Sequence, residues 1–181
     1  AIAEDTAGGI WVASYTGLRG SWEQLLTHYS KGRVTEYTLA DGIIDNITDI
    51  HADAENRLWF SSHSQGLQSL RGDTLTRYAI RQDSWDVGVD GIAQDAAGRL
   101  WLSMDTGLSI FDGHSLQSFS QEDGVAGWSP LAASEDGMWV GSRQVLNMKA
   151  DGTTTRLDTA GMADYRGAVD IDANGSDLWI A

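Results

Sequence analysis

Apolar and polar residues alternate along this chain in short runs, with turns rich in glycine and acidic residues between them. Alternating runs occur at 47–50 and 89–93. A Leu-Trp-Leu run at 100–102 is followed by a Leu-Ser-Ile-Phe run at 108–111. Such runs are typical of short β-strands, whereas only 22–29 has spacing that briefly suits an amphipathic helix. Further β-prone runs lie at 34–38, 75–79, 116–119 and 154–157. The pattern therefore predicts an all-β fold with four short strands per unit.

A tryptophan near the start of each second strand marks an internal repeat. It follows an acidic turn and recurs roughly every 40–50 residues, at Trp11, Trp59, Trp101, Trp139 and Trp179. This period predicts a β-propeller with one four-stranded blade per repeat. The expected repeats are 1–46, 47–88, 89–128, 129–167 and 168–181. The repeat tryptophans are expected to pack between neighbouring blades rather than to contact a ligand.

Four complete blades and the first hairpin of a fifth are expected, and this arrangement leaves exposed sheet edges. Closed propellers have about four to eight blades, and unpaired edges of an apolar sheet favour aggregation. The chain also opens within a repeat and shows no signal peptide. We therefore expect it to be a piece of a longer protein whose other residues complete a larger ring.

Two turns of the repeat carry glycine or asparagine, which tolerate positive φ, in four of the five copies each. The first turn, between strands one and two, carries Gly8, Asn56, Gly98 and Gly175. The turn between strands three and four carries Gly32, Gly72, Gly113 and Gly152. The first repeat has about eight more residues than the others between its second and third strands. The acidic residues of the first turn are expected to accept backbone N–H bonds.

Charge and composition exclude several classes of function. The net charge of −14 disfavours binding to a nucleic-acid backbone or to an anionic membrane surface. No apolar run approaches the roughly 20 residues that cross a bilayer, and the absence of cysteine excludes thiol catalysis and disulfides. Residues 170–175 resemble the opening of a calcium loop, but the glutamate expected at the twelfth position is replaced by Ala181. No metal or other cofactor is therefore expected.

The order of the hairpins predicts where ligand-binding residues gather. Chain direction reverses at each strand, so the links between strands two and three share one end with the links between blades. These links are longer and more irregular than the glycine turns, and propellers usually bind ligands on such loops. The residues expected there are Trp22, Trp85, Trp128, Tyr15, His63, Asp86, Asp105, Arg143, Tyr165 and Arg166.

The chemistry of this end suits a sugar, because aromatic rings beside carboxylate, guanidinium and amide groups match apolar sugar faces and hydroxyl edges. An alternative is that the three tryptophans only cover the ends of the inter-blade core. An acid–base pair of His63 with Asp86 or Asp105 would suit an enzyme, but no HExxH or GxSxG motif is present. The remaining histidines, His28, His51 and His114, are expected to be surface residues.

The phrase acid-x-x-Gly-x-Leu-Trp, followed by Thr-x-Gly-Leu or a variant, resembles the two-component regulator propeller repeat. Residues 95–108 match best and 5–18 nearly as well, while 53–67 has Asn56 in place of the glycine. The fourth copy departs most, because it lacks two turn residues and has 142–146 where Gly-Leu is expected. The resemblance covers essentially the whole chain.

This resemblance implies a seven-bladed periplasmic sensor of a hybrid histidine kinase or diguanylate cyclase. The expected function is therefore binding of a small molecule or glycan in a receptor dimer, without enzymatic activity. The implied alternatives are a propeller lyase related to the streptogramin lyases, whose catalytic residues are His and Glu, and a protein-interaction scaffold. No nucleic-acid partner and no membrane insertion by this segment are expected.

Overall fold

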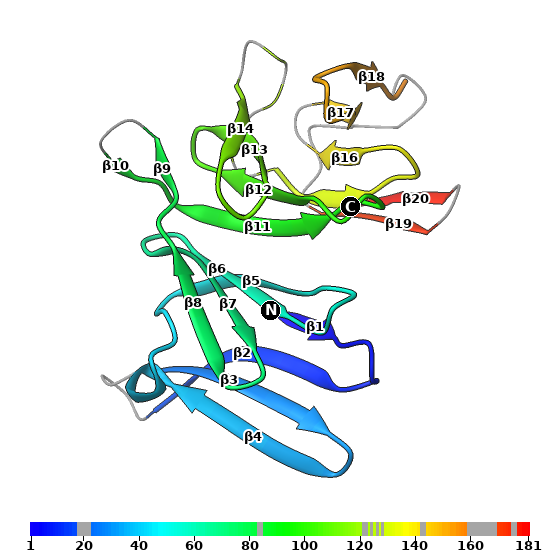
Figure 1. The fold of residues 1–181 in the computed structure, drawn as a ribbon. Coiled ribbons are helices and arrows are strands. Elements are labelled where there is room, and N and C mark those ends of the chain that lie inside the picture. Colours follow the sequence, from blue (N-terminus) through cyan, green and yellow to red (C-terminus); the bar gives the residue numbers. More distant parts are fainter. Residues whose placement is uncertain are drawn as a thin grey trace. The chain divides into compact units, whose positions relative to one another are not determined.

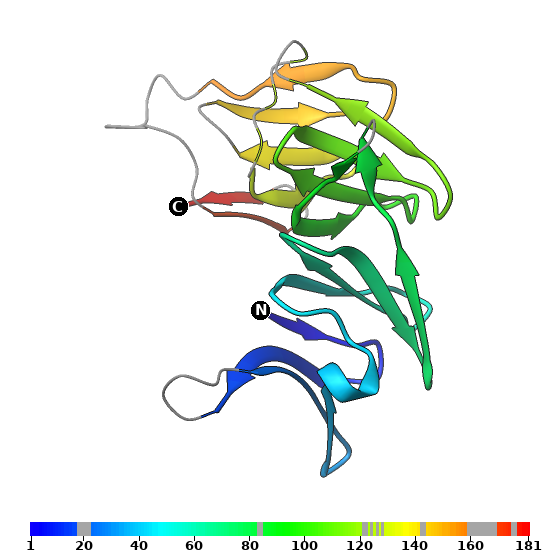
Figure 2. The ribbon, with the colours of Figure 1, turned by 90° about the vertical axis from the view of Figure 1, so that its left-hand side faces the viewer.

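The computed structural model describes residues 1–17, 23–82, 85–120, 123, 125, 127, 129–141, 144–158, 170–174 and 177–181, with the backbone alone at 81–82, 85–86 and 174. Within these ranges the strands form four four-stranded antiparallel sheets and two two-stranded hairpins (Figure 1). A 3-10 helix, η1 (Leu39–Asp41), lies in the connection between β4 and β5 (Figure 2). The all-β architecture expected from the sequence is confirmed.

Each four-stranded sheet consists of four strands that follow one another in the chain. The first sheet contains β1 (Ile2–Glu4), β2 (Ile10–Thr16), β3 (Glu23–Ser30) and β4 (Arg33–Thr38). The second contains β5 (Ile47–Ala52), β6 (Leu58–Ser62), β7 (Gly66–Arg71) and β8 (Thr74–Tyr78). The third contains β11 (Val89–Gln94), β12 (Leu100–Met104), β13 (Gly107–Phe111) and β14 (Leu116–Phe119). The fourth contains β15 (Leu131–Ala133), β16 (Met138–Gly141), β17 (Val145–Met148) and β18 (Thr154–Arg156).

The two hairpins are β9 (Arg81–Gln82) with β10 (Trp85–Asp86), and β19 (Ile171–Asn174) with β20 (Asp177–Ile180). The extra residues of the first repeat partly lengthen its strands. β2 and β3 have 7 and 8 residues, against 5 and 6 for β6 and β7 of the second sheet. No helix in the described part of the chain is long and apolar enough to cross a membrane.

The chain forms two compact units, Ala1–Ile92 and Ala93–Ala181, and each has its own apolar core. In the first unit, Leu26 and Phe60 are fully buried in a cluster shared by the first and second sheets. In the second unit, Trp101 and Met138 lie in a cluster shared by the third and fourth sheets. A smaller cluster around Val145 joins the fourth sheet to the β19–β20 hairpin.

The acidic turn is held together by a single carboxylate. In the third sheet, Asp95 Oδ1 accepts hydrogen bonds from the backbone N–H groups of Ala97 and Arg99, both at 3.0 Å. Its Oδ2 accepts from Trp101 Nε1 at 2.8 Å and from Arg99 Nε at 2.7 Å. Asp53 repeats this pattern with Trp59 Nε1, at 3.0 Å. The expected backbone bonds to the turn acids are confirmed, and the bond to the indole is an addition.

In the first repeat, the carboxylate of the same turn has a different side-chain partner. Asp5 Oδ1 accepts from the backbone N–H groups of Ala7 and Gly9 at 2.8 Å, but its Oδ2 is bonded to His28 Nε2 at 2.8 Å. The His28 ring stacks on Trp11, with centroids 4.0 Å apart. His28 is therefore not the surface residue expected from the sequence, because its side chain is only 22% exposed.

Three of the five repeat tryptophans are buried and a fourth is partly buried. Trp11 and Trp101 lie in the two main cores, Trp59 is also buried, and Trp139 packs partly buried against the β19–β20 hairpin. Trp179 differs and is 65% exposed. On β20 its neighbours Leu178 and Ile180 point into the core, so strand alternation directs the Trp179 ring to the opposite face.

Candidate functional site

The longer links lie at one end of each sheet, where the sequence predicts the ligand-binding residues. In the first unit this end includes the link from β4 to β5, at 39–46, and the link from β6 to β7, at 63–65. Tyr15 lies at this end of β2 and is 46% exposed. Its hydroxyl donates to Asn46 Oδ1 at 2.8 Å. The end of β2 and the link between the first two sheets therefore meet here.

The backbone of Asn46 has a φ of 56°, in the left-handed region. Asparagine tolerates this region better than most residues, which suits it to this position. Asn46 is not among the residues predicted from the sequence. Its signal was weak, since Asp45-Asn46 directly before an apolar strand looks like an ordinary turn. The structure makes it one half of an exposed aromatic–amide pair with Tyr15.

A second polar pair at this end joins His63 to Asp90. His63 Nδ1 and Asp90 Oδ1 are 3.1 Å apart, with the imidazole 46% exposed and the carboxylate 15% exposed. Gly88 lies against the backbone carbonyl of His63, where a Cβ would clash, and so allows the two segments to approach closely. The pair can orient an imidazole for proton transfer or for hydrogen bonding to a polar ligand.

Asp90 was not proposed from the sequence as a partner of His63, and the two proposed carboxylates, Asp86 and Asp105, stay a prediction. Asp86 is described only by its backbone in β10, and Asp105 belongs to the other unit. Asp90 follows the apolar Val89 on β11 and alternates with it in burial. Its position next to His63 arises from the long-range return of the chain, which spacing along the sequence does not reveal.

Two buried glutamines hold the link between the first two sheets in position. Gln24 on β3 accepts from the backbone N–H of Ile47 at 2.8 Å and donates to the Ser14 carbonyl at 2.7 Å. Gln68 on β7 accepts from the backbone N–H of Ile44 at 3.0 Å and donates to a carbonyl of the same link. These amides satisfy backbone groups that the irregular link leaves without sheet partners. They position Asn46 rather than contact a ligand themselves.

Asp49 lies on β5, within a run that the sequence pattern predicts as a strand. A β-bulge between Ile47 and Asp49 shifts the register here. Burial raises the pKa of Asp49, although N–H bonds from Ile92 and Ile50, at 2.9 and 2.8 Å, act in the opposite direction. Asp49 thus bridges two segments of the first unit that are distant in sequence.

In the second unit, the link from β14 to β15 lies against the turn from β12 to β13. Gly127 sits against the backbone carbonyl of Asp105, where a Cβ would clash. The Ser129 N–H donates to Ser103 Oγ at 2.8 Å. Asp105 is therefore at the expected end of its sheet, beside a link that leads to the next sheet.

The other residues expected at this end are not placed by the structure. Five lie outside the described residues: Trp22, Trp128, Arg143, Tyr165 and Arg166. For Trp85 and Asp86 the structure describes only the backbone, in β10. The aromatic surface formed by the three tryptophans therefore stays a prediction.

The chain is similar in structure to virginiamycin B lyase from Staphylococcus aureus, with 15% identity and a TM-score of 0.75. This similarity covers 99% of the chain and 61% of the lyase. It is also similar to the extracellular domain of BT4673 from B. thetaiotaomicron, assigned as a one-component system, with 14% identity and a TM-score of 0.74 over 99% of this chain and 25% of the other.

A third similar structure is the extracellular domain of BT3049 from B. thetaiotaomicron, assigned as a hybrid two-component system. Identity is 12%, the TM-score is 0.68, and the match covers 100% of this chain and 31% of the other. No family model and no curated protein matches the sequence. The chain thus spans less than two thirds of each of these proteins, and at such low identity it shares their fold, which occurs both in lyases and in extracellular sensor domains.

Proposed function

We propose that this chain is part of the ligand-sensing β-propeller of a bacterial two-component-type receptor. It binds a small extracytoplasmic molecule, for which a carbohydrate is the best chemical match, at the end formed by the longer links. Two of the similar structures are extracellular domains of signalling proteins, which supports this role.

The observation that carries the proposal is the pairing of Tyr15 with Asn46. An exposed phenol ring beside an amide offers an apolar face and several hydrogen-bonding groups at one place. The exposed imidazole of His63, oriented by Asp90, adds a second polar group to this end of the first unit. Sugars require this combination, because each ring has an apolar face and a polar edge.

A tryptophan-fluorescence titration against a panel of glycans tests the proposal. We expect at least one glycan to change the emission, and Tyr15→Ala and Trp85→Ala to weaken its binding by about tenfold, equivalent to ~1.4 kcal/mol. Tyr29→Ala is the matched control, because Tyr29 is 49% exposed but lies near the glycine turn of β3. If no glycan changes the emission, or if all three variants bind with the same affinity, the proposal that this end binds a sugar is wrong.

In this role the ligand would bind two arrangements of a receptor dimer with different affinities, because a ligand shifts only an equilibrium that it distinguishes. The module would lie in the periplasm or outside the cell, like the extracellular domains to which it is similar. Attaching the full-length receptor to a reporter tests this role. Its output should respond to the ligand found by titration and lose that response in Tyr15→Ala.

A propeller lyase is the second candidate, favoured by the His63–Asp90 pair. Incubation with quinupristin, the compound in a structure of a catalytically inactive virginiamycin B lyase, followed by chromatography, tests it. An elimination that opens a ring keeps the leaving group in the same molecule and leaves the mass unchanged, so a shift in retention is the readout. A shift that disappears in His63→Ala would replace the sensing proposal by catalysis.

We also propose that further blades of the same propeller cover the exposed apolar residues at the margins of the two units. In the first sheet, Tyr29 and Val34 are cross-strand partners, 49% and 57% exposed, and Ile2 is 70% exposed. In the β19–β20 hairpin, the exposed apolar residue is Trp179. Trp11, Trp101 and Trp139 each pack against the next repeat in the chain. This supports the proposal that a further blade covers the exposed apolar residues.

A further inference from the structure

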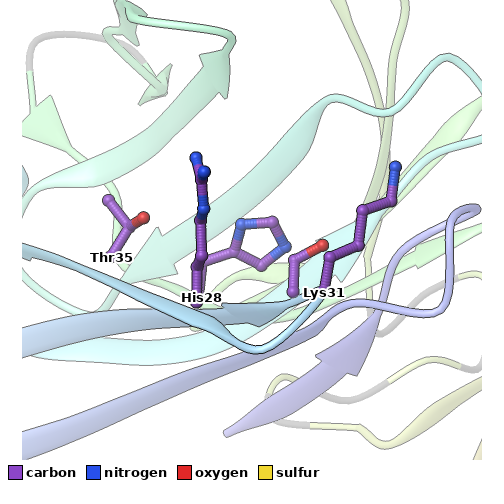
Figure 3. A pocket seen from close by; sticks show the side chains of 5 residues that line it. His28, Lys31 and Thr35 are labelled. Atoms are coloured by element: carbon purple, nitrogen blue, oxygen red, sulfur yellow. The ribbon is translucent and has the colours of Figure 1, made fainter.

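A hollow of about 410 Å³ lies on one face of the β3–β4 hairpin. Its lining residues are His28, Ser30, Lys31, Arg33 and Thr35. Figure 3 shows the side chains of His28, Lys31 and Thr35 rising from the same side of the two strands. The strand register explains this, because His28 pairs with Thr35 and Ser30 pairs with Arg33 across the ladder.

The first repeat lacks an arginine that two other repeats have, and the hollow lies beside the histidine that replaces it. The residue two positions before the repeat tryptophan is Arg57 in the second repeat and Arg99 in the third. Arg57 lies over the ring of its own tryptophan, 5.2 Å from the centroid, and Arg99 is bonded to Asp95. Gly9 occupies this position in the first repeat, and a Cβ there would clash with Asp5 and His28. The His28 ring instead takes the place of the arginine over the tryptophan, and the hollow lies beside this ring on the β3–β4 hairpin.

The chemistry of the hollow is cationic in a strongly acidic chain. Neither Lys31 nor Arg33 forms an ion pair with any residue that the structure describes, although the net charge is −14. The hydroxyls of Ser30 and Thr35 stand beside them. Asp5, the nearby carboxylate, is bonded to His28 and to two backbone N–H groups. Both oxygens of Asp5 are thus bonded to groups other than Lys31 and Arg33.

Lys31 is held in an unusual backbone conformation. Its φ is 50°, and it forms the turn together with Gly32, whose φ is 74°. This region is uncommon for residues other than glycine, asparagine and aspartate. Glycine would fit this turn without strain, so the lysine side chain is present at a cost in stability, as is typical of residues retained for function.

We propose that this hollow binds a tetrahedral oxyanion, either a sulfate or a phosphate group. Arg33 offers a planar fork of donors and Lys31 a point charge, the two groups with which proteins most often bind such anions. The hydroxyls of Ser30 and Thr35 complete the donor set. The site lies by the glycine turns of the first sheet, at the opposite end of its strands from Tyr15. It is therefore independent of the ligand site proposed above.

Isothermal titration calorimetry with inorganic phosphate and sulfate, against a constant chloride background, tests the site. We expect both anions to bind, and Arg33→Gln and Lys31→Gly each to weaken binding by about tenfold. Arg156→Gln is the matched control, because it removes the same charge from the exposed outer strand of another sheet. Thermal unfolding supplies a second readout, in which Lys31→Gly should unfold at a higher temperature without ligand while binding less anion.

The same titration distinguishes a free ion from a group carried by an organic molecule. Phenyl phosphate and phenyl sulfate are compared with the inorganic ions. Tighter binding of the esters would support the site and assign it to an ester-bound group, whereas equal affinities would support a site for the free ion. Absence of binding by all four compounds, or equal losses in Arg33→Gln and Arg156→Gln, would overturn the proposal.

Discussion

The indole Nε1 of Trp101 donates a hydrogen bond to Oδ2 of Asp95 at 2.8 Å, and both residues are buried. The other oxygen of the same carboxylate accepts two backbone N–H groups of the turn. One side chain therefore fixes the turn between two strands and the orientation of the ring that fills the core. This explains why an acid precedes the tryptophan in the repeated phrase, and it makes the pair a sensitive place for mutation.

Replacement of Asp95 by alanine is expected to destabilise the chain by about 3 kcal/mol, because buried donors lose a charged acceptor. Chemical denaturation followed by circular dichroism measures this. Asp136→Ala is the matched control, because Asp136 belongs to the shortened turn of the fourth repeat and is 58% exposed, paired only with Lys149 among the described residues. Its effect should stay below about 0.5 kcal/mol. Equal losses in the two variants would contradict the role of the carboxylate.

Acid should weaken the fold through these same turns. Burial opposes ionisation, but hydrogen bonds from Trp101 and Arg99 outweigh it and lower the pKa of Asp95. Bonds from Gly9, His28 and Ala7 likewise outweigh burial and lower the pKa of Asp5.

A lowered folded-state pKa means that each group contributes stability above its unfolded pKa of about 3.9 and loses it as the pH falls through the folded value. The urea midpoint should therefore decrease from pH 5 downward. Asp95→Asn should reduce the slope of this decrease, and an unchanged slope would show that other carboxylates cause it.

Gly9 and His28 are expected to behave as a coupled pair. Gly9→Arg alone should destabilise the first repeat, since any Cβ at this position clashes with the His28 ring and Asp5. His28→Ser alone should also destabilise it, since Asp5 and Trp11 lose their partner. The double variant recreates the second repeat, in which Arg57 lies over Trp59 and Ser69 is paired with that tryptophan.

We expect the double variant to be more stable than the sum of the single changes predicts, by about 1–3 kcal/mol. A double-mutant cycle in urea measures this coupling. Additive effects would show that His28 does not replace the arginine.

The exposed apolar residues at the margins should make this segment associate when it is produced alone. Sedimentation velocity should show a concentration-dependent increase in size, because Trp179 and Val34 are 65% and 57% exposed. Trp179→Ser combined with Val34→Lys should shift the segment toward the monomer. Tyr15→Ser, which removes a ring that is 46% exposed at the loop-bearing end, is the control and should not. A monomer at all concentrations would contradict further blades as the cover for these residues.

The site was only partly accessible from the sequence. Tyr15 and His63 were expected at the loop-bearing end because strand direction alone decides which links share an end. Their partners Asn46 and Asp90 were missed, since each is brought there from 31 or 27 residues away by the pairing of strands. The buried Gln24 and Gln68 were missed for the same reason, because what they bind is the backbone of a different sheet or link.

The sequence by itself determined the four-stranded units, their order and their turns. The reason is that strand alternation, the acid before each tryptophan and glycine at positive φ act between residues close in the chain. Gly8, Asn56 and Gly98 indeed have φ of 79°, 60° and 78°.

Only the tertiary structure decided that His28 takes the place of an arginine and leaves a cationic hollow beside it. That exchange depends on which side chain fills the space beside Asp5, an arginine at position 9 or His28, which lies 23 residues after Asp5. Such a contact is set by packing between strands, so no local pattern contains it.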